Sequence, residues 1–221
     1  MNKASYIFAP SVQHTGTWFL LEGLKRHSKL DGLIMFGEMR EKTPDPEKEY
    51  ILHVHIGDGS SPLNLPYHST YMALDVMTRV LKTAIPLRDP LLSMLSRHKR
   101  HPMLSHSYLV DGFVYLAKMR ADCFFLPVDI LGDSSLEKRK GALNSLFYYL
   151  GLEREPFIDE WAEQWEWVNV NPVPYTEIDW YREGAVNKLR KLFPEDFDYL
   201  ELNAHVIKPF LSQQGYKNLI W

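Results

Sequence analysis

Short apolar runs alternate with stretches of helical periodicity along most of this chain. Four apolar runs predict buried strands, at residues 5–9, 49–56, 83–87 and 122–130. The first run is followed by Pro10, which we expect to close the strand. Apolar residues at helical spacing predict helices at residues 17–27, 69–83, 90 onward, 135–150, 183–193 and 197–213.

The alternation of strands and helices predicts an α/β fold. Such an order favours a three-layer α/β/α arrangement, in which helices cover both faces of a mostly parallel central sheet. Nothing in the pattern divides the chain, so we expect a single domain over residues 1–221. Its sites should lie at the carboxyl ends of the strands. Trp161 and Trp165 lie four positions apart, on one helical face that we expect to pack onto the domain.

The composition narrows the classes of partner. Hydrophobic residues make up 45% of the 221 residues and charged residues 24%, as in ordinary globular proteins. The formal net charge of −3 offers no positive field for nucleic acid or an anionic membrane, so a bound anion needs a local site. Cys123 is the one cysteine, which excludes an internal disulfide. No run has the length of a signal peptide core or a membrane span, and we expect a cytoplasmic monomer or homodimer.

The first candidate anion site is the loop between the first strand and the first helix. It reads His14-Thr15-Gly16-Thr17-Trp18. A loop that leaves a buried strand and begins a helix presents backbone N–H groups at the positive end of the helix dipole. Gly16 allows a ligand to approach the backbone, and the threonine hydroxyls add donors. Such a loop suits phosphate or sulfate, although taken alone the motif favours a plain helix cap with a glycine turn.

The second candidate anion site follows the strand at residues 83–87. Asp89 is a good N-cap and Pro90 suits the first helical position, so a helix begins here. Arg88 stands at the strand end, where its guanidinium can bind an anion in bidentate fashion. Ser96 lies two turns further along the helix. Helix capping explains Asp89 and Pro90 but not Arg88.

Together these motifs resemble the sulfotransferases that use 3′-phosphoadenosine-5′-phosphosulfate (PAPS). In that family a loop of the form Lys/Arg-Ser/Thr-Gly-Thr binds the 5′-phosphosulfate. An Arg-Asn/Asp-Pro sequence, with a serine eight residues after the arginine, binds the 3′-phosphate. The matching residues in this chain are Thr15, Gly16 and Thr17 for the first motif, and Arg88, Asp89, Pro90 and Ser96 for the second.

Further segments extend the resemblance to the C-terminus. Residues 128–131 (VDIL), followed by a helix and residues 149–152 (YLGL), are similar to the family's "EdL … fLGL" segment, and residues 214–216 (QGY) are similar to the end of many short members. The resemblance implies a P-loop NTPase-like sulfotransferase fold. It also implies that His14, Thr15, Gly16, Thr17, Trp18, Arg88 and Ser96 bind PAPS and its product adenosine 3′,5′-bisphosphate. No Gly-x-x-x-x-Gly-Lys-Ser/Thr run is present, which disfavours a Walker-type kinase or NTPase.

His14 is the clearest departure from the family, because a lysine or arginine is expected at its position. In the family that cation contacts the oxygen that bridges phosphate and sulfate. A histidine can take this catalytic role only when it is protonated. The helix N-terminus opposes that charge and the phosphates of a bound nucleotide favour it.

The base that takes the proton of the acceptor has several candidates. Residues 52–57 (LHVHIG) are similar to the family's "K-T-H-L-P" strand, which places His55 in the position of the catalytic histidine. His53 and His55 point to the same face of the strand, and a purely structural histidine pair is an equal alternative. Glu38 is a fallback base. We expect no metal, because the His-x-His pair lacks an obvious third ligand.

These observations predict an enzyme that transfers a sulfuryl group from PAPS to a hydroxyl or amine of a small molecule or glycan. The basic stretch at residues 97–101 (RHKRH) is a solvated helix face that also raises the potential around a 3′-phosphate. Two alternatives stay open: a nucleotide-binding module of the same fold without transfer activity, and a related phosphotransferase.

Overall fold

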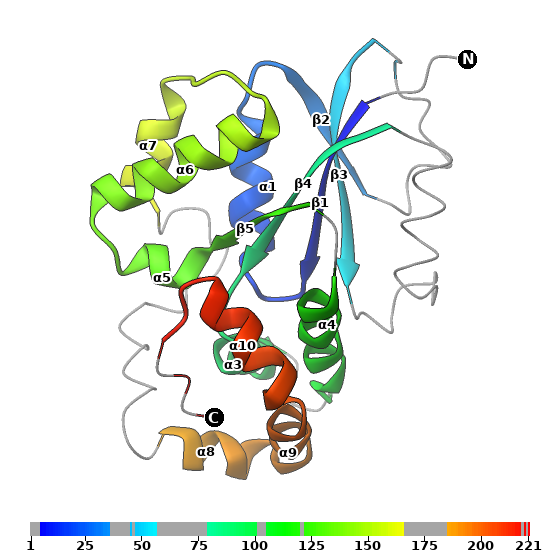
Figure 1. The fold of residues 1–221 in the computed structure, drawn as a ribbon, viewed down its shortest axis with the longest axis vertical. Coiled ribbons are helices and arrows are strands. Elements are labelled where there is room, and N and C mark those ends of the chain that lie inside the picture. Colours follow the sequence, from blue (N-terminus) through cyan, green and yellow to red (C-terminus); the bar gives the residue numbers. More distant parts are fainter. Residues whose placement is uncertain are drawn as a thin grey trace.

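The architecture is a parallel sheet between two layers of helices (Figure 1). The computed structural model describes residues 5–35, 45, 47–56, 79–100, 105–119, 122–165, 185–217, 219 and 221. Its sheet has the strand order β2-β3-β1-β4-β5, and all four pairs of neighbouring strands are parallel. The strands are β1 (Ser5–Val12), β2 (Leu30–Met35), β3 (Glu49–Ile56), β4 (Arg79–Leu87) and β5 (Phe124–Pro127).

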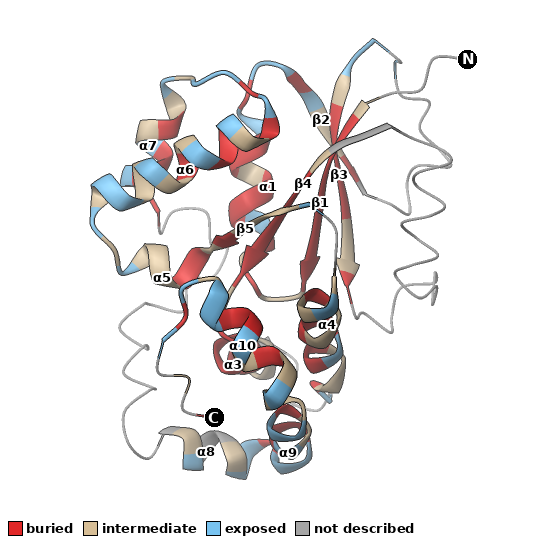
Figure 2. Cartoon of the chain, viewed as in Figure 1, coloured by how far each residue is buried: buried red, intermediate tan, exposed pale blue. Residues whose placement is uncertain are grey.

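Each face of the sheet has its own hydrophobic core. On one face, Ile7 and Ile51 pack with α1 (Thr17–Lys25), α6 (Leu136–Leu150) and α7 (Phe157–Glu163). On the other, the second core gathers the helices α3 (Pro90–Arg100), α4 (Ser107–Lys118), α9 (Pro194–Leu202) and α10 (Ala204–Gln213). The short α5 (Val128–Gly132) follows β5, and α8 (Ala185–Leu192) precedes α9. Buried residues line both layers where they meet the sheet (Figure 2), which confirms the predicted three-layer α/β fold.

Three predicted strand ends are wrong. β1 continues through Pro10 to Val12, because it pairs with β4 only as far as Phe8 and Pro10 therefore costs no hydrogen bond on that side. β4 already begins at Arg79, where we predicted helix up to residue 83, since pairing with the central strand outweighs local helical spacing. Residues 69–78 lie outside the described part of the chain. β5 ends at Pro127, and the following residues form α5.

The C-terminal region is more divided than its periodicity indicates. The single helix predicted at residues 197–213 is two helices, with a break at Asn203 between α9 and α10. α9 begins three residues earlier than predicted, with Pro194 in its first turn. β2 and α4 were not predicted, and α7 was indicated only by the helical spacing of Trp161 and Trp165, which are both buried as expected. The end of α6 is confirmed, because Gly151 adopts the left-handed conformation (φ 72°) that stops a helix.

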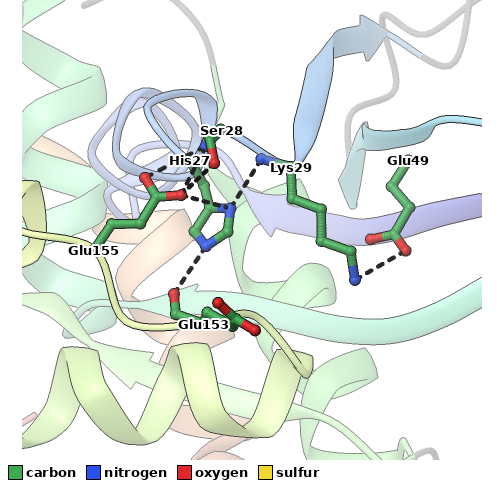
Figure 3. Close-up of polar contacts among 6 residues, drawn as sticks. All are labelled: His27, Ser28, Lys29, Glu49, Glu153 and Glu155. Carbon is green, nitrogen blue, oxygen red and sulfur yellow. Dashed lines mark hydrogen bonds and ion pairs between the residues drawn. The ribbon is translucent and has the colours of Figure 1, made fainter.

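Polar contacts attach the end of α1 to the loop after α6 (Figure 3). The His27 ring donates a hydrogen bond from Nε2 to the Glu153 carbonyl (2.9 Å) and accepts one at Nδ1 from the Lys29 N–H (3.2 Å). The Ser28 N–H donates to the Glu155 carboxylate (3.1 Å). The chain therefore leaves α1 in a fixed direction, toward the edge strand β2.

The packing of α1 on α7 depends on a missing side chain. A Cβ atom added to Gly23 would lie 2.0 Å from Cζ2 of Trp161. The Trp161 ring is 1% exposed and touches Phe19 with ring centroids 5.1 Å apart, so it has no space into which to move. Gly23 thus sets how closely α1, whose first turn carries the candidate site, approaches its neighbours.

We predict that Gly23→Ala destabilises the protein although alanine favours helices. Overpacking a core typically costs about 1–3 kcal/mol in the free energy of unfolding. The matched control is Gly141→Ala in α6, where an added Cβ meets nothing within 4 Å. That change should stabilise by roughly 0.5–1 kcal/mol through helix propensity. Urea denaturation measures both, and a stabilised Gly23→Ala variant would contradict this packing.

Candidate functional site at the carboxyl edge of the sheet

The loop between β1 and α1 lies at the carboxyl edge of the sheet, beyond its central strand. Gly16 is the N-cap residue of α1 and has a left-handed backbone (φ 93°), as does His14 (φ 63°). A Cβ atom at Gly16 would lie 3.0 Å from Cγ2 of Val128 at the start of α5, so glycine is required both by φ and by space. The predicted order of strand, loop and helix is confirmed.

The threonine hydroxyls of this loop are engaged within the protein. The Thr15 hydroxyl donates to the Val12 carbonyl (2.7 Å), and the Thr17 hydroxyl is hydrogen-bonded to that of Ser11 (2.7 Å). Both threonines are buried. The Thr15 hydroxyl therefore gives its proton to the loop itself, whereas the Thr17 hydroxyl can accept from Ser11 and donate its own proton to an anion. The N–H groups in the first turn of α1, which have no partner within the helix, are further donors that the loop can offer.

The second motif adopts the predicted helix start. The Leu91 N–H donates to the Asp89 carboxylate (2.8 Å), which confirms Asp89 as the N-cap of α3. Arg88 is half-buried at the end of β4. Within the described part of the chain its charge acts on the Asp129 carboxyl, and no hydrogen bond or ion pair involves it. Among the described residues its guanidinium therefore has no hydrogen-bonded or ion-paired partner, and the Asp129 carboxyl is the charge on which it acts.

The structure brings the two motifs into contact. The His14 ring is hydrogen-bonded through Nδ1 to the Ser96 hydroxyl (3.2 Å), across 82 positions of sequence. The Ser93 hydroxyl, one turn earlier on α3, lies 3.4 Å from the His14 carbonyl oxygen and 3.1 Å from that of Asp89. The loop before α1 and the first two turns of α3 thus form one surface. The N-termini of α1 and α3 lie at this surface, together with His14 and Arg88.

The buried Asp129 supports this surface through hydrogen bonds and was not among the predicted site residues. Its carboxylate accepts the Asp89 N–H (2.8 Å) at one oxygen and the Tyr216 hydroxyl (2.5 Å) at the other. Burial raises the pKa of the Asp129 carboxyl, whereas those hydrogen bonds and the charge of Arg88 act in the opposite direction. The only sequence signal was its place in the VDIL segment, and that segment gave no role to the side chain.

One residue of the predicted basic patch reaches the first loop. Arg97 lies 3.4 Å from the Gln13 side-chain oxygen through Nη1, and its guanidinium stacks on the Tyr108 ring at 4.5 Å. The Tyr108 hydroxyl donates to the same Gln13 oxygen (2.9 Å). Arg97 therefore adds a permanent positive charge beside His14. The side chains of residues 99 and 100 and all of residue 101 lie outside the described set.

The two histidines of β3 have different environments. His53 is 1% exposed and donates from Nδ1 to the Ala9 carbonyl (2.6 Å). Burial, reinforced by the neighbouring His55, lowers the pKa of His53 to about 3. His55 is half-buried near the carboxyl end of the strand, with its ring at 89° to that of His53. This environment gives His53 a structural role and leaves His55 as the candidate base; Glu38 lies outside the described residues.

Trp18 completes the set of predicted residues. It is the second residue of α1, and 47% of it is exposed although its neighbour Phe19 is fully buried. A half-exposed indole beside the candidate anion-binding loop is a surface on which an aromatic base can stack. No three His, Cys, Asp or Glu side chains of the described chain gather closely enough to hold a metal ion. Among the described helices, none is long and apolar enough to span a membrane.

The buried His53 generates a specific pH dependence. Burial holds the pKa of His53 at about 3 and that of His106 at about 4 in the folded protein, while an unfolded chain binds a proton near pH 6.5. We predict that the contribution of these two histidines to the free energy of unfolding is complete above about pH 6.5 and is lost as the pH drops toward 3. His53→Asn retains a donor for the Ala9 carbonyl but cannot titrate. Its urea midpoint should depend less on pH than that of the wild type, and parallel profiles would contradict the assignment.

Comparisons with known proteins support the fold of the chain. No protein-family model matches the chain, and no curated protein matches it in sequence. Its structure is similar to the crystal structure of mouse sulfotransferase SULT7A1 in complex with PAP (adenosine 3′,5′-bisphosphate), with a TM-score of 0.52 and 13% sequence identity. The match covers 96% of this chain and 88% of that one. At this identity the likeness shows the fold alone, a sulfotransferase-like α/β fold.

Proposed function

We propose that this protein binds PAPS at the carboxyl edge of its sheet and transfers the sulfuryl group to a hydroxyl or amine of a small molecule or glycan. The observation that carries the proposal is the hydrogen bond between His14 and Ser96, because it joins two anion-binding motifs into one site. The mouse sulfotransferase of similar fold was crystallised with PAP, which supports the same class of ligand here.

Each part of the nucleotide has a matching group. The N–H groups at the start of α1 suit the 5′-phosphosulfate, because they lie at the positive end of the helix dipole. Arg88 and Ser96 suit the 3′-phosphate, one as a bidentate cation and one as a hydroxyl donor. The exposed indole of Trp18 suits the adenine ring. With a net charge of −3, the protein relies on these local groups to attract an anion.

The chemistry requires little more than alignment and charge. The acceptor oxygen or nitrogen attacks the sulfur, the bond from sulfur to the bridging oxygen breaks, and the bisphosphate leaves with the electron pair. Catalysis of this kind rests on positioning and electrostatic stabilisation. We assign His14, when protonated, to the charge on the leaving phosphate, and His55 to the proton of the acceptor.

A nucleotide-binding module without transfer activity is the second candidate. His14 favours it, because a neutral imidazole hydrogen-bonded to Ser96 does not stabilise a leaving phosphate. Arg97, which lies beside Gln13, favours the enzyme instead, because it supplies a fixed positive charge close to the loop. Turnover of PAPS therefore separates the two functions, whereas binding does not.

The 3′-phosphate assignment predicts a selective ligand. Adenosine 3′,5′-bisphosphate should raise the melting temperature much more than AMP or ATP, by an amount that corresponds to about 2.7 kcal/mol at a hundredfold excess over Kd. Arg88→Ala should remove most of this gain, because a charge-assisted contact is lost. The exposed Arg154 lies outside the site, so Arg154→Ala is the control and should leave the gain intact. Equal stabilisation by AMP and bisphosphate would contradict the assignment.

The catalytic roles predict a separation of binding from turnover. Wild-type protein incubated with PAPS and a metabolite mixture should form bisphosphate and a sulfated product detectable by mass spectrometry. His55→Ala should lower this turnover by roughly 10²–10⁴-fold, the usual contribution of an acid–base group, and His14→Ala by roughly 10²–10³-fold, as for the loss of an electrostatic contact to developing charge. Both should change bisphosphate affinity much less.

His53→Asn is the control for this assay, because His53 faces the Ala9 carbonyl and should be dispensable for transfer. His14→Lys provides a fixed charge and should retain turnover. A wild type that binds bisphosphate but releases no sulfate to any acceptor would establish the binding module instead.

A further inference from the structure

The C-terminal end of α10 holds one side chain against the candidate site. Gly215 has a left-handed backbone (φ 94°), and its N–H donates to the Ser212 carbonyl (3.1 Å). The Tyr216 N–H donates to the Leu211 carbonyl (3.1 Å). This pair of bonds is the Schellman motif, which fixes the chain direction after a helix. The Tyr216 backbone is therefore held, and its side chain is directed inward, where it is 5% exposed.

The inward side chain meets the carboxylate of Asp129, which holds the turn at residues 88–90 between β4 and α3, here called the Arg88 turn. The Tyr216 hydroxyl donates to one oxygen of Asp129 (2.5 Å), and the other oxygen accepts the Asp89 N–H (2.8 Å). Asp129 is 6% exposed, so neither bond is readily replaced by water. A continuous chain of hydrogen bonds thus leads from the end of α10 to the residue next to Arg88.

The same short segment also supports the first loop. Val128 packs against Gly16 through its side chain, and its carbonyl oxygen accepts the indole N–H of Trp165 (3.0 Å). Residues 128 and 129 consequently contact both halves of the candidate site, the loop before α1 and the turn before α3. A shift of Asp129 would displace the Arg88 turn relative to that loop.

We propose that Asp129 and Tyr216 are positioning residues that couple the C-terminal segment to nucleotide binding. They hold the Arg88 turn in the position in which Arg88 can contact a 3′-phosphate. The inference rests on the proposed function, since it needs PAPS or bisphosphate as the ligand. Neither residue touches the nucleotide. Nucleotide binding therefore favours the arrangement in which Tyr216 is hydrogen-bonded to Asp129. Because coupling is reciprocal, loss of this hydrogen bond weakens nucleotide binding by the factor by which the nucleotide stabilises it.

The test compares two tyrosine substitutions of the same chemistry. Tyr216→Phe removes only the hydroxyl that Asp129 accepts. Tyr199→Phe removes a hydroxyl that donates to Asp111 (2.6 Å) between α9 and α4, away from Asp129. The affinities of wild type and both variants for adenosine 3′,5′-bisphosphate and for AMP are measured by titration calorimetry. Melting temperatures without nucleotide show that each variant is folded.

We expect Tyr216→Phe to weaken bisphosphate binding by about fivefold or more, the lower end of typical coupling between sites. AMP binding should change less, because AMP lacks the phosphate that the Arg88 turn receives, so the ratio of the two affinities falls. Tyr199→Phe should keep both affinities. A merely structural role for Tyr216 would lower both affinities together and leave their ratio unchanged.

An unchanged ratio in Tyr216→Phe, with a wild type that prefers bisphosphate, overturns the coupling and leaves the proposed function standing. A wild type that shows no preference for bisphosphate overturns the proposed function and this inference with it. If Tyr216→Phe is too unstable to titrate, Asp129→Ala and Asp129→Asn replace it as a pair. Alanine removes both hydrogen bonds and should lower the affinity ratio, whereas asparagine can accept the Asp89 N–H and donate to the Tyr216 oxygen and should preserve it. The same ratio in both variants would overturn the coupling.

Discussion

One buried carboxylate, that of Asp129, joins the parts of the chain on which the candidate site depends. Removing a carboxylate from water is costly unless its oxygens receive hydrogen bonds. Tyr216 from the C-terminal segment and the Asp89 N–H supply them, and Arg88 supplies a nearby positive charge. The cost of burying the charge thus specifies the arrangement, because the carboxylate is stable only where these groups meet. That meeting point lies at the carboxyl edge of the parallel sheet, where α/β folds bind their ligands.

The local features of the site could be predicted from sequence because each has a local physical cause. Asp89 before Pro90 indicated a helix start, and the Leu91 N–H confirms it. The loop at Gly16 was predicted from its position between a buried strand and a helix. The hydrogen bond between His14 and Ser96, and that between Asp129 and Tyr216, join positions 82 and 87 residues apart, and no local pattern encodes such pairings. The same limit explains the errors in the fold, since β4 begins early through pairing with β1 and not through its own propensity.

The histidines illustrate how environment, more than spacing, decides a role. His53 and His55 follow one alternating pattern, yet one donates to a strand carbonyl in the core and the other lies half-buried at the strand end. The fold likeness to mouse sulfotransferase SULT7A1 extends over 96% of the chain at 13% identity, so the architecture is shared far more widely than the residues. The proposed function therefore depends on His14, Arg88, Ser96 and their contacts. Arg97 beside Gln13 gives this chain a cation near the loop that its sequence motif lacks.

The central claim is that two distant segments bind one nucleotide through its two phosphate positions. Amide hydrogen exchange followed by mass spectrometry tests it directly, because it reports on residues 13–18 and 88–96 in the same sample. Adenosine 3′,5′-bisphosphate should slow exchange in both segments, while AMP, which lacks the 3′-phosphate, should slow it chiefly in the first. Protection by the bisphosphate of neither segment, or of only one, would contradict the account.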